Sequence, residues 1–148
     1  MISDIRKILI AEDNANDAEL TLTAFRENRL GNELVLVRDG EQALAYLYCR
    51  NQYAGRRDGH PALVVLDLKM PKVDGLEVLR QVKADAGLKH IPVVILTSSR
   101  EEQDLIRSYD LGVNAYVVKP VAFEEFVQAV KLLGGFWAVV NEPPPARR

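Results

Sequence analysis

Five short apolar runs, with helix-like segments between and after them, constrain the fold of this chain most strongly. The runs are rich in Val, Ile or Leu with little polar alternation, and they occupy residues 7–11, 34–37, 62–67, 92–97 and 115–118. Strands of this composition are covered on both faces, as in parallel sheets. The clearest of the helical stripes that separate or follow the runs consists of Phe123, Phe126, Val127, Val130 and Leu133. The pattern therefore predicts five strands that alternate with five helices.

This alternation predicts an α/β fold with a parallel sheet and right-handed crossovers. The expected form is a doubly wound, flavodoxin-like (βα)5 sheet with strand order 2-1-3-4-5 and three α/β/α layers. Asp74 is placed to cap the helix that begins at Gly75, and Gly112 is placed to end the fourth helix. Asn14 or Asn16 is placed to cap the first helix.

Two segments depart from the regular pattern. Residues 49–61 form a long polar connection, which we interpret as an extension of the second helix followed by a loop. Gly134 and Gly135 interrupt the last helix, and an apolar run and three prolines follow them. We therefore assign residues 1–135 to one domain and residues 136–148 to a C-terminal tail.

Charge and cysteine content argue against several classes of protein. The 148 residues include 19 Lys and Arg and 21 Asp and Glu, which gives a formal net charge of −2. No stripe of basic residues suggests a nucleic-acid surface. No apolar run is long enough for a signal peptide or a membrane span, so no membrane contact is expected. The single cysteine, Cys49, cannot form an internal disulfide and fits a reducing, cytoplasmic setting.

Three carboxylates end the two strands between which the winding direction is expected to reverse. Glu12 and Asp13 follow the first strand, and Asp67 ends the third. Doubly wound sheets bind ligands outside these strand ends, and three carboxylates packed there without a cation would repel one another. Mg²⁺ prefers a few carboxylates, waters and a phosphate oxygen as ligands. The pattern predicts a Mg²⁺ site, against the simpler interpretation that these acids only keep a loop in solvent.

The fourth and fifth strands end in groups that suit a phosphoryl group. Thr97 offers a hydroxyl that can donate a hydrogen bond, and Lys119 offers a compact positive charge. Pro120 follows Lys119, and the bond between them is a candidate for the cis form, which would direct the lysine side chain into the pocket.

These residues, in this order, resemble the receiver domains of two-component response regulators. The resemblance covers roughly residues 7–133. The long connection after the second helix and the tail also resemble the small response regulators that are paired with bacterial phytochromes. The matching motifs are Glu12-Asp13, Asp67 within the sequence LVVLDLKMPKVDG, Thr97-Ser98 and Lys119-Pro120.

The resemblance implies a chemistry centred on Asp67. This residue would accept a phosphoryl group from a sensor histidine kinase, with a phytochrome-type kinase (a bacteriophytochrome) as the expected donor. Glu12, Asp13, Asp67 and the backbone carbonyl of Lys69 would hold Mg²⁺. Positioning and charge neutralisation would account for most of the catalysis.

The resemblance also implies how the signal leaves the site. Thr97 and Lys119 would bind the acyl-phosphate oxygens, and Tyr116 would turn inward when Thr97 moves. Lys69 and Ser99 occupy positions that tune dephosphorylation in the family. The chain would catalyse only its own phosphorylation and dephosphorylation. It would act through an unknown downstream protein, and the sequence leaves open whether it is an effector, a phosphate shuttle or a phosphate sink.

Two other functions use a similar sheet. A Mg²⁺-dependent phosphohydrolase with an aspartyl-phosphate intermediate usually carries an Asp-x-Asp pair, whereas Asp67 here has Lys69 two places on. A flavodoxin-like electron carrier needs a Ser/Thr/Gly loop that cradles a phosphate after the first strand, where this chain has acids. Both are less consistent with the sequence than a receiver.

The tail predicts a homodimer. Its apolar residues are Phe136, Trp137, Val139 and Val140. An exposed run of this kind would be an unusual patch on a monomer. We expect each tail to pack on the partner's face formed by the fourth helix, fifth strand and fifth helix, and two-fold dimers are the commonest soluble oligomers. The alternative is that the tail folds back over its own domain.

Overall fold

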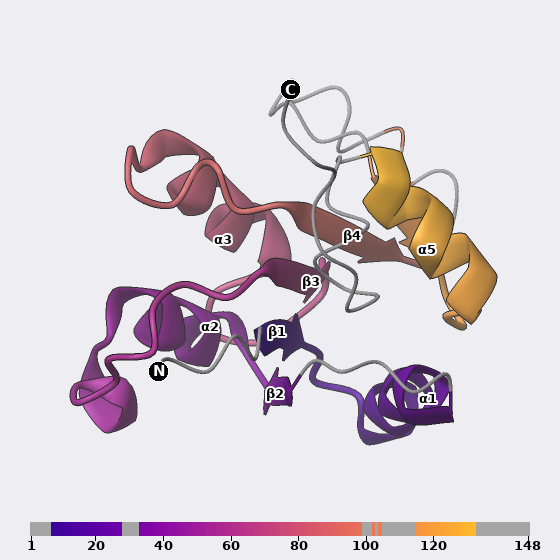
Figure 1. The fold of residues 1–148 in the computed structure, drawn as a ribbon, viewed down its shortest axis with the longest axis horizontal. Helices are drawn as coiled ribbons and strands as arrows, with labels where there is room; N and C mark the ends of the chain where they lie inside the picture. Colours follow the sequence, from indigo (N-terminus) through magenta and orange to yellow (C-terminus); the bar gives the residue numbers. More distant parts are fainter. Residues whose placement is uncertain (1–6, 28–32, 99–101, 103, 105–114, 133–148) are drawn as a thin grey trace, which may run out of the picture.

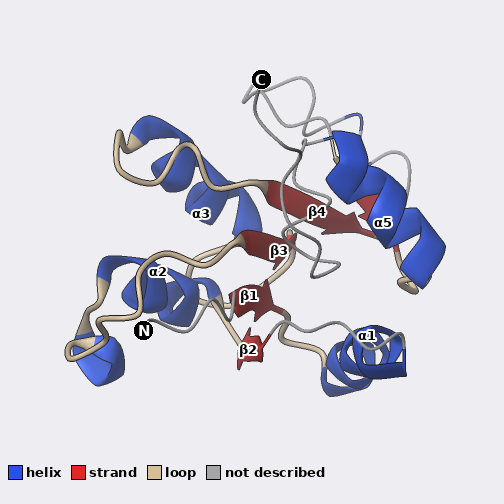
Figure 2. Cartoon of the chain, viewed as in Figure 1, coloured by secondary structure: helices blue, strands red, loops and turns tan. Residues whose placement is uncertain are grey.

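The computed structural model describes residues 7–27, 33–98, 102, 104 and 115–132. Figures 1 and 2 show the arrangement of its helices and strands. The strands are β1 (Lys7–Ala11), β2 (Glu33–Val37), β3 (Leu63–Asp67), β4 (Val93–Thr97) and β5 (Tyr116–Val118). The helices are α1 (Ala15–Glu27), α2 (Gly40–Tyr48), α3 (Gly75–Ala84) and α5 (Phe123–Leu132), with a single 3-10 turn, η1 (Asn51–Tyr53). The fourth predicted helix falls mostly outside the described residues, as does Gly112.

The strands form one sheet in the order β2-β1-β3-β4-β5, and every neighbouring pair is parallel. This confirms the doubly wound order 2-1-3-4-5. The predicted strand positions are confirmed to within one residue at each end. The chain moves from β1 outward to β2 on one side, and then crosses back to β3 on the other side of β1. The direction of winding therefore reverses between β1 and β3, whose carboxyl ends border the reversal point.

Helices cover both faces of the sheet and form the two outer layers. In Figure 1, α2 and α3 lie on one side of the strands, and α1 and α5 lie on the other. The strand side chains alternate between the two resulting cores. In β1, Leu9 and Ala11 pack in the core with α2 and α3, whereas Ile8 and Ile10 pack in the core with α1 and α5. Burial on both faces explains why the strands lack polar alternation.

Local signals set several helix ends. Asp74 is the N-cap of α3, and its side chain accepts a hydrogen bond from the Glu77 amide, as predicted. The Asn14 side chain accepts from the Asp17 amide in the first turn of α1. The predicted extension of the second helix is wrong, because α2 ends at Tyr48 and Cys49 adopts a left-handed conformation. The polar connection then makes the single turn η1.

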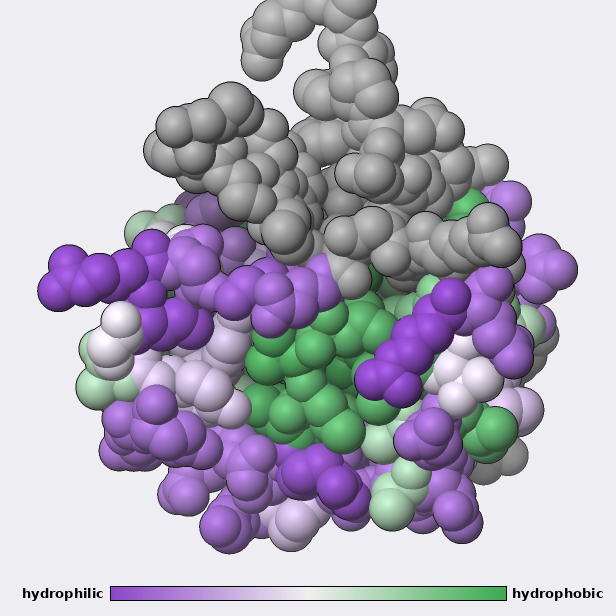
Figure 3. All heavy atoms as spheres, turned by 60° about the horizontal axis from the view of Figure 1, so that its bottom comes forward, coloured by the Kyte–Doolittle hydropathy of each residue, from purple (hydrophilic) through white to green (hydrophobic). Residues whose placement is uncertain are grey.

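An apolar area lies on one face of the described surface. Figure 3 shows it on the face that lies at the bottom of Figure 1, flanked by hydrophilic residues. The edge strand β2 lies at the bottom of Figure 1, and its residues Leu34, Val35 and Leu36 are only partly buried. Among the described helices, none has the length and apolar character needed to span a membrane.

Candidate functional site

Three carboxylates, two just after β1 and one at the end of β3, meet at the carboxyl edge of the sheet. Glu12 and Asp67 are buried and Asp13 is exposed, and one oxygen atom from each lies within 4.8 Å of the others. The close approach of α3 fixes this edge, because the Gly75 amide donates to the Leu68 carbonyl at 2.8 Å. A Cβ atom on Gly75 would lie 2.2 Å from the Asp67 carbonyl oxygen, so glycine is required at this contact. The structure thus brings together the three acids singled out in the sequence.

Lys119 supplies a positive charge to the same cluster. Its Nζ lies 2.8 Å from Glu12 Oε1, 3.0 Å from Asp17 Oδ2 and 3.3 Å from Asp67 Oδ2. Burial alone would lower the pKa of Lys119, but the hydrogen bonds and charges of these carboxylates outweigh burial and raise it. Lys119 is therefore a fixed cation within an acidic pocket. The peptide bond between Lys119 and Pro120 is cis.

Asp67 has a strongly perturbed pKa. Burial, followed by the hydrogen bond and negative charge of Glu12, raises its pKa from 3.8 to about 7, and the nearby Lys119 opposes this increase. Perturbed pKa values of this kind cluster at functional sites. Burial and the neighbouring carboxylate thus make the ionised form of Asp67 less favourable in this pocket than in water.

Thr97 ends β4 beside the cluster. Lys119 donates its amide to the Thr97 carbonyl at 2.9 Å, which links the ends of β4 and β5. The Thr97 side chain is fully buried, and among the described residues its hydroxyl has no hydrogen-bond partner. A buried hydroxyl without a partner is costly, and an incoming oxygen ligand would satisfy it.

A second ion pair lies farther out, between the segments that follow β3 and β4. Lys69 Nζ lies 2.8 Å from Glu102 Oε2, and Glu102 also accepts from the amide and hydroxyl of Ser98 at 2.8 Å and 3.0 Å. These donors lower the pKa of Glu102 although burial would raise it. The pair joins the segment after Asp67 to the segment after Thr97.

Three residues near the site went unnoticed in the sequence: Asp17, Arg38 and Glu102. Arg38 donates from Nη2 to the Asp13 carbonyl at 3.1 Å, and the other two pair with the lysines as described. Asp17 offered a usable signal, because it lies one helical turn beyond the acidic pair. Arg38 reaches the site from the bend after β2, and Glu102 reaches it from a helical position after β4, and the sequence has no regular pattern for either contact.

The acidic cluster fits a divalent metal ion. All of its donors are oxygen atoms, the type preferred by hard cations such as Mg²⁺ and Mn²⁺. Two of the three carboxylates are buried, and burial of uncompensated negative charge is unfavourable. The side chains of Glu12, Asp13 and Asp67 are therefore suitable metal ligands.

Other residues singled out in the sequence fall elsewhere. Tyr116 begins β5, is partly buried and packs against the core on the side of α2 and α3. Ser99 and the tail residues Phe136, Trp137, Val139 and Val140 lie outside the described residues. His60 and His90 lie away from the site on the exposed surface, with their ring centroids 6.1 Å apart.

Comparison with known proteins identifies the family. Residues 8–131 match the family described as the response regulator receiver domain. The chain belongs to this family. This response regulator is similar to Rcp1 of Synechocystis sp., with 38% identity over 139 residues that cover 94% of this chain and 93% of Rcp1.

Solved structures of phytochrome response regulators resemble this receiver along its length. The structure of the bacteriophytochrome response regulator AtBRR is 60% identical with a TM-score of 0.90, covering 95% of this chain and 100% of AtBRR. The Mn²⁺-bound form of Rcp1 is 36% identical with a TM-score of 0.72, covering 95% of this chain and 99% of Rcp1. Aspartate phosphorylation is the general mechanism of this family. The receiver is a signalling protein and not a conventional enzyme, which sets aside the phosphohydrolase and electron-carrier alternatives.

Proposed function

We propose that Asp67 accepts a phosphoryl group from a sensor histidine kinase and that the resulting change of shape transmits the signal. The observation that carries this proposal is the buried Asp67 carboxylate, which lies with Glu12 and Asp13 and within 3.3 Å of the Lys119 ammonium. The similarity to AtBRR and Rcp1 favours a phytochrome-type kinase as the donor. The proposal also places the protein in the cytoplasm, where such kinases expose their phosphohistidine.

The transfer is a displacement at phosphorus. An Asp67 carboxylate oxygen forms a new bond to phosphorus while the bond from phosphorus to the donor's imidazole nitrogen breaks. The bonding electron pair stays on that nitrogen. Lys119 offers positive charge to the phosphoryl oxygens. The Thr97 hydroxyl, which has no partner among the described residues, offers a hydrogen bond to one of them.

The metal in this proposal is Mg²⁺, held by the carboxylates of Glu12, Asp13 and Asp67 together with the backbone carbonyl of Lys69. When bound, it would neutralise the negative charge of the carboxylates, which otherwise repels an incoming phosphoryl group. Lys69 and Ser99 would then adjust how long the acyl phosphate survives, since the protein would also dephosphorylate itself.

The downstream partner is another protein, and the switch that presents a new surface involves Thr97 and Tyr116. We also propose a homodimer in which the apolar residues of the 136–148 tail contact the partner. The apolar sequence of the tail and its position after a helix with its own complete apolar stripe support this proposal.

The test uses the purified chain with Mg²⁺ and acetyl phosphate as a small donor. One hydroxylamine-labile phosphate per chain is expected, located on Asp67 by mass spectrometry of peptides. Asp67→Asn or removal of Mg²⁺ with EDTA should reduce the incorporation at least about a hundredfold, because nucleophile or charge neutralisation is lost. Asp74→Asn serves as the control, because it changes the exposed N-cap of α3 and leaves the pocket residues as they are. A label on a Ser, Thr or His side chain would refute the assignment.

A further inference from the structure

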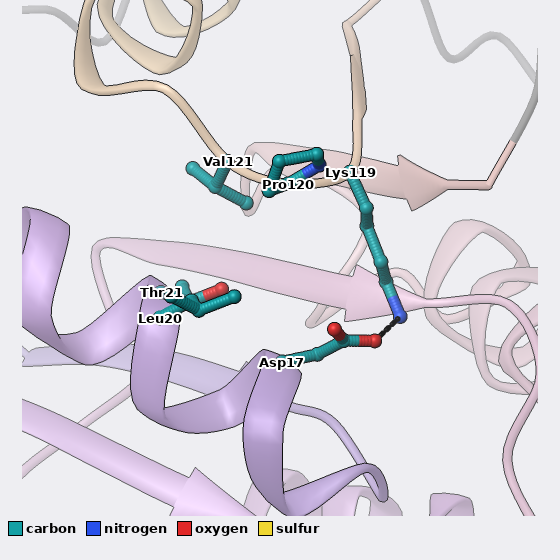
Figure 4. A pocket seen from close by; sticks show the side chains of 6 residues that line it. All are labelled: Asp17, Leu20, Thr21, Lys119, Pro120 and Val121. Atoms are coloured by element: carbon teal, nitrogen blue, oxygen red, sulfur yellow. Dashed lines mark hydrogen bonds and ion pairs between the residues drawn. The ribbon is translucent and has the colours of Figure 1, made fainter.

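The Lys119 ammonium has a carboxylate partner outside the acidic cluster. Asp17, in the first turn of α1, contacts Lys119 through its Oδ2 at 3.0 Å with hydrogen-bond geometry. Figure 4 shows the two side chains reaching toward each other across a small pocket. The pocket is lined by Asp17, Leu20, Thr21, Lys119, Pro120 and Val121. The pair therefore joins α1 to the segment that follows β5.

Of the three carboxylates around Lys119, Asp17 is the one that is not a candidate metal ligand. Glu12 and Asp67 belong to the cluster suited to a metal ion, whereas Asp17 does not. An ammonium has three hydrogen atoms to donate, and three carboxylates surround this one. If Glu12 and Asp67 turn to a cation or a phosphoryl group, Asp17 is the partner that remains.

The first turn of α1 holds Asp17 in place. Its amide donates to the Asn14 side chain at 2.9 Å, and a carboxylate in the first turn is favoured by the positive end of the helix dipole. The Asp17 side chain is about one-third exposed, with a relative accessibility of 34%, whereas Lys119 is more buried at 17%. The Asp17 carboxylate thus lies at the solvent-exposed edge of the acidic cluster, where it contacts the Lys119 ammonium from the side of α1.

We infer that Asp17 is a positioning residue for the phosphorylation proposed above. It acts through Lys119 by holding the ammonium on the α1 side of the pocket, with one donor hydrogen directed toward the phosphoryl oxygens. The inference rests on the proposed role of Asp67. Without Asp17, the flexible lysine side chain loses its fixed direction, and the transfer becomes slower.

A simpler interpretation makes the opposite prediction. If Asp17 were only a negative charge near the pocket, it would repel the anionic donor, and its neutralisation would speed phosphorylation. The sign of the effect of Asp17→Asn therefore separates positioning from simple charge repulsion. A purely structural role in α1 would change thermal stability without affecting Lys119.

The experiment compares the wild-type chain with Asp17→Asn, Asp17→Glu and the control Glu19→Gln. Glu19 is an exposed acid on the same helix, so its substitution removes one negative charge from α1. The first measurement is the phosphorylation rate at saturating acetyl phosphate with Mg²⁺. Asp17→Asn is expected to be roughly fivefold slower, because the pair is partly exposed and its contribution is modest. Asp17→Glu should recover part of the rate, and Glu19→Gln should leave it unchanged.

The second measurement needs no phosphate donor. It is made with Mg²⁺ and beryllofluoride, so that Glu12 and Asp67 are engaged and Asp17 is the remaining carboxylate partner of Lys119. The side-chain ammonium signal of Lys119 should be observable by ¹⁵N NMR in the wild type, because the ion pair slows exchange with water. It should weaken or disappear in Asp17→Asn but persist in Glu19→Gln. A rate for Asp17→Asn equal to or above that of the wild type would overturn the inference, as would an unchanged Lys119 signal. If Asp17→Asn does not fold, Asp17→Ser provides the same comparison.

Failure of this inference can be distinguished from failure of the proposed function. If the wild type gains phosphate on Asp67 but Asp17→Asn is not slower, the positioning role is wrong and the function stands. If Asp67→Asn gains phosphate as the wild type does, the proposed function is wrong, and the positioning role falls with it.

Discussion

At the residue scale, the pKa of Asp67 predicts how the stability of the metal-free protein depends on pH. The folded-state pKa is raised from 3.8 to about 7, so the folded protein retains a proton that the unfolded chain has already released. The free energy of unfolding should therefore fall as the pH rises from about 4 to about 7. Asp67→Asn, which cannot ionise, should lack this component and be more stable than the wild type at pH 8, by roughly 1–3 kcal/mol.

Urea unfolding in EDTA at pH 5 and pH 8 measures this difference. Asp58 does not interfere with this comparison. The hydrogen bond from Lys7 lowers its pKa to about 2, even though burial opposes the shift, so its effect on stability falls below pH 4. Glu19→Gln is the control for loss of an exposed carboxylate. An equal loss of stability between pH 5 and pH 8 in the wild type and in Asp67→Asn would contradict the prediction.

At the element scale, β4 and β5 should carry the signal away from the pocket. Thr97 ends β4 with a buried hydroxyl that lacks a partner among the described residues, and Tyr116 begins the neighbouring strand. A phosphoryl group that binds the Thr97 hydroxyl would favour the state in which Tyr116 moves inward, as a shift between two populations. With Mg²⁺ and beryllofluoride as a phosphate mimic, amide shifts are expected at the end of β4 and through β5. Asp67→Asn should show none of them, and shifts confined to the loop after Asp67 would rule out this route.

The sequence predicted the strands, their order and most of the site because each has a regular signal. Strands buried on both faces have continuous apolar runs, and residues that end neighbouring parallel strands must share an edge. That reasoning brought Asp67 together with Glu12 and Asp13. It could not find Arg38 or Glu102, since these side chains reach the site from segments after β2 and β4 whose paths depend on packing. The end of α2 was also missed, because Cys49 adopts a left-handed conformation that its residue type does not favour.

At the scale of the whole molecule, the proposed dimer should depend on the tail. Light scattering at about 100 µM compares the full chain with a chain that ends at Gly135. We expect a dimer for the full chain and a monomer for the shortened one, because the shortened chain lacks the apolar residues of 136–140. A chain shortened by only its last three residues is the control. Two monomers would refute the dimer, and two dimers of equal affinity would refute the role of the tail.

The two lysine clusters of the site differ in their sensitivity to ionic strength. The Lys69 side chain is 77% exposed, so dissolved ions can surround its pair with Glu102, whereas Lys119 and Glu12 lie where few ions can enter. At about 0.1 M salt, exposed charges are screened beyond about 10 Å, and more salt weakens exposed pairs further. Concentrated salt would therefore weaken the ion pair that links the segments after β3 and β4 and leave the inner charges nearly unaffected. The pocket thus combines an inner arrangement insensitive to the electrolyte with an outer rim that responds to it.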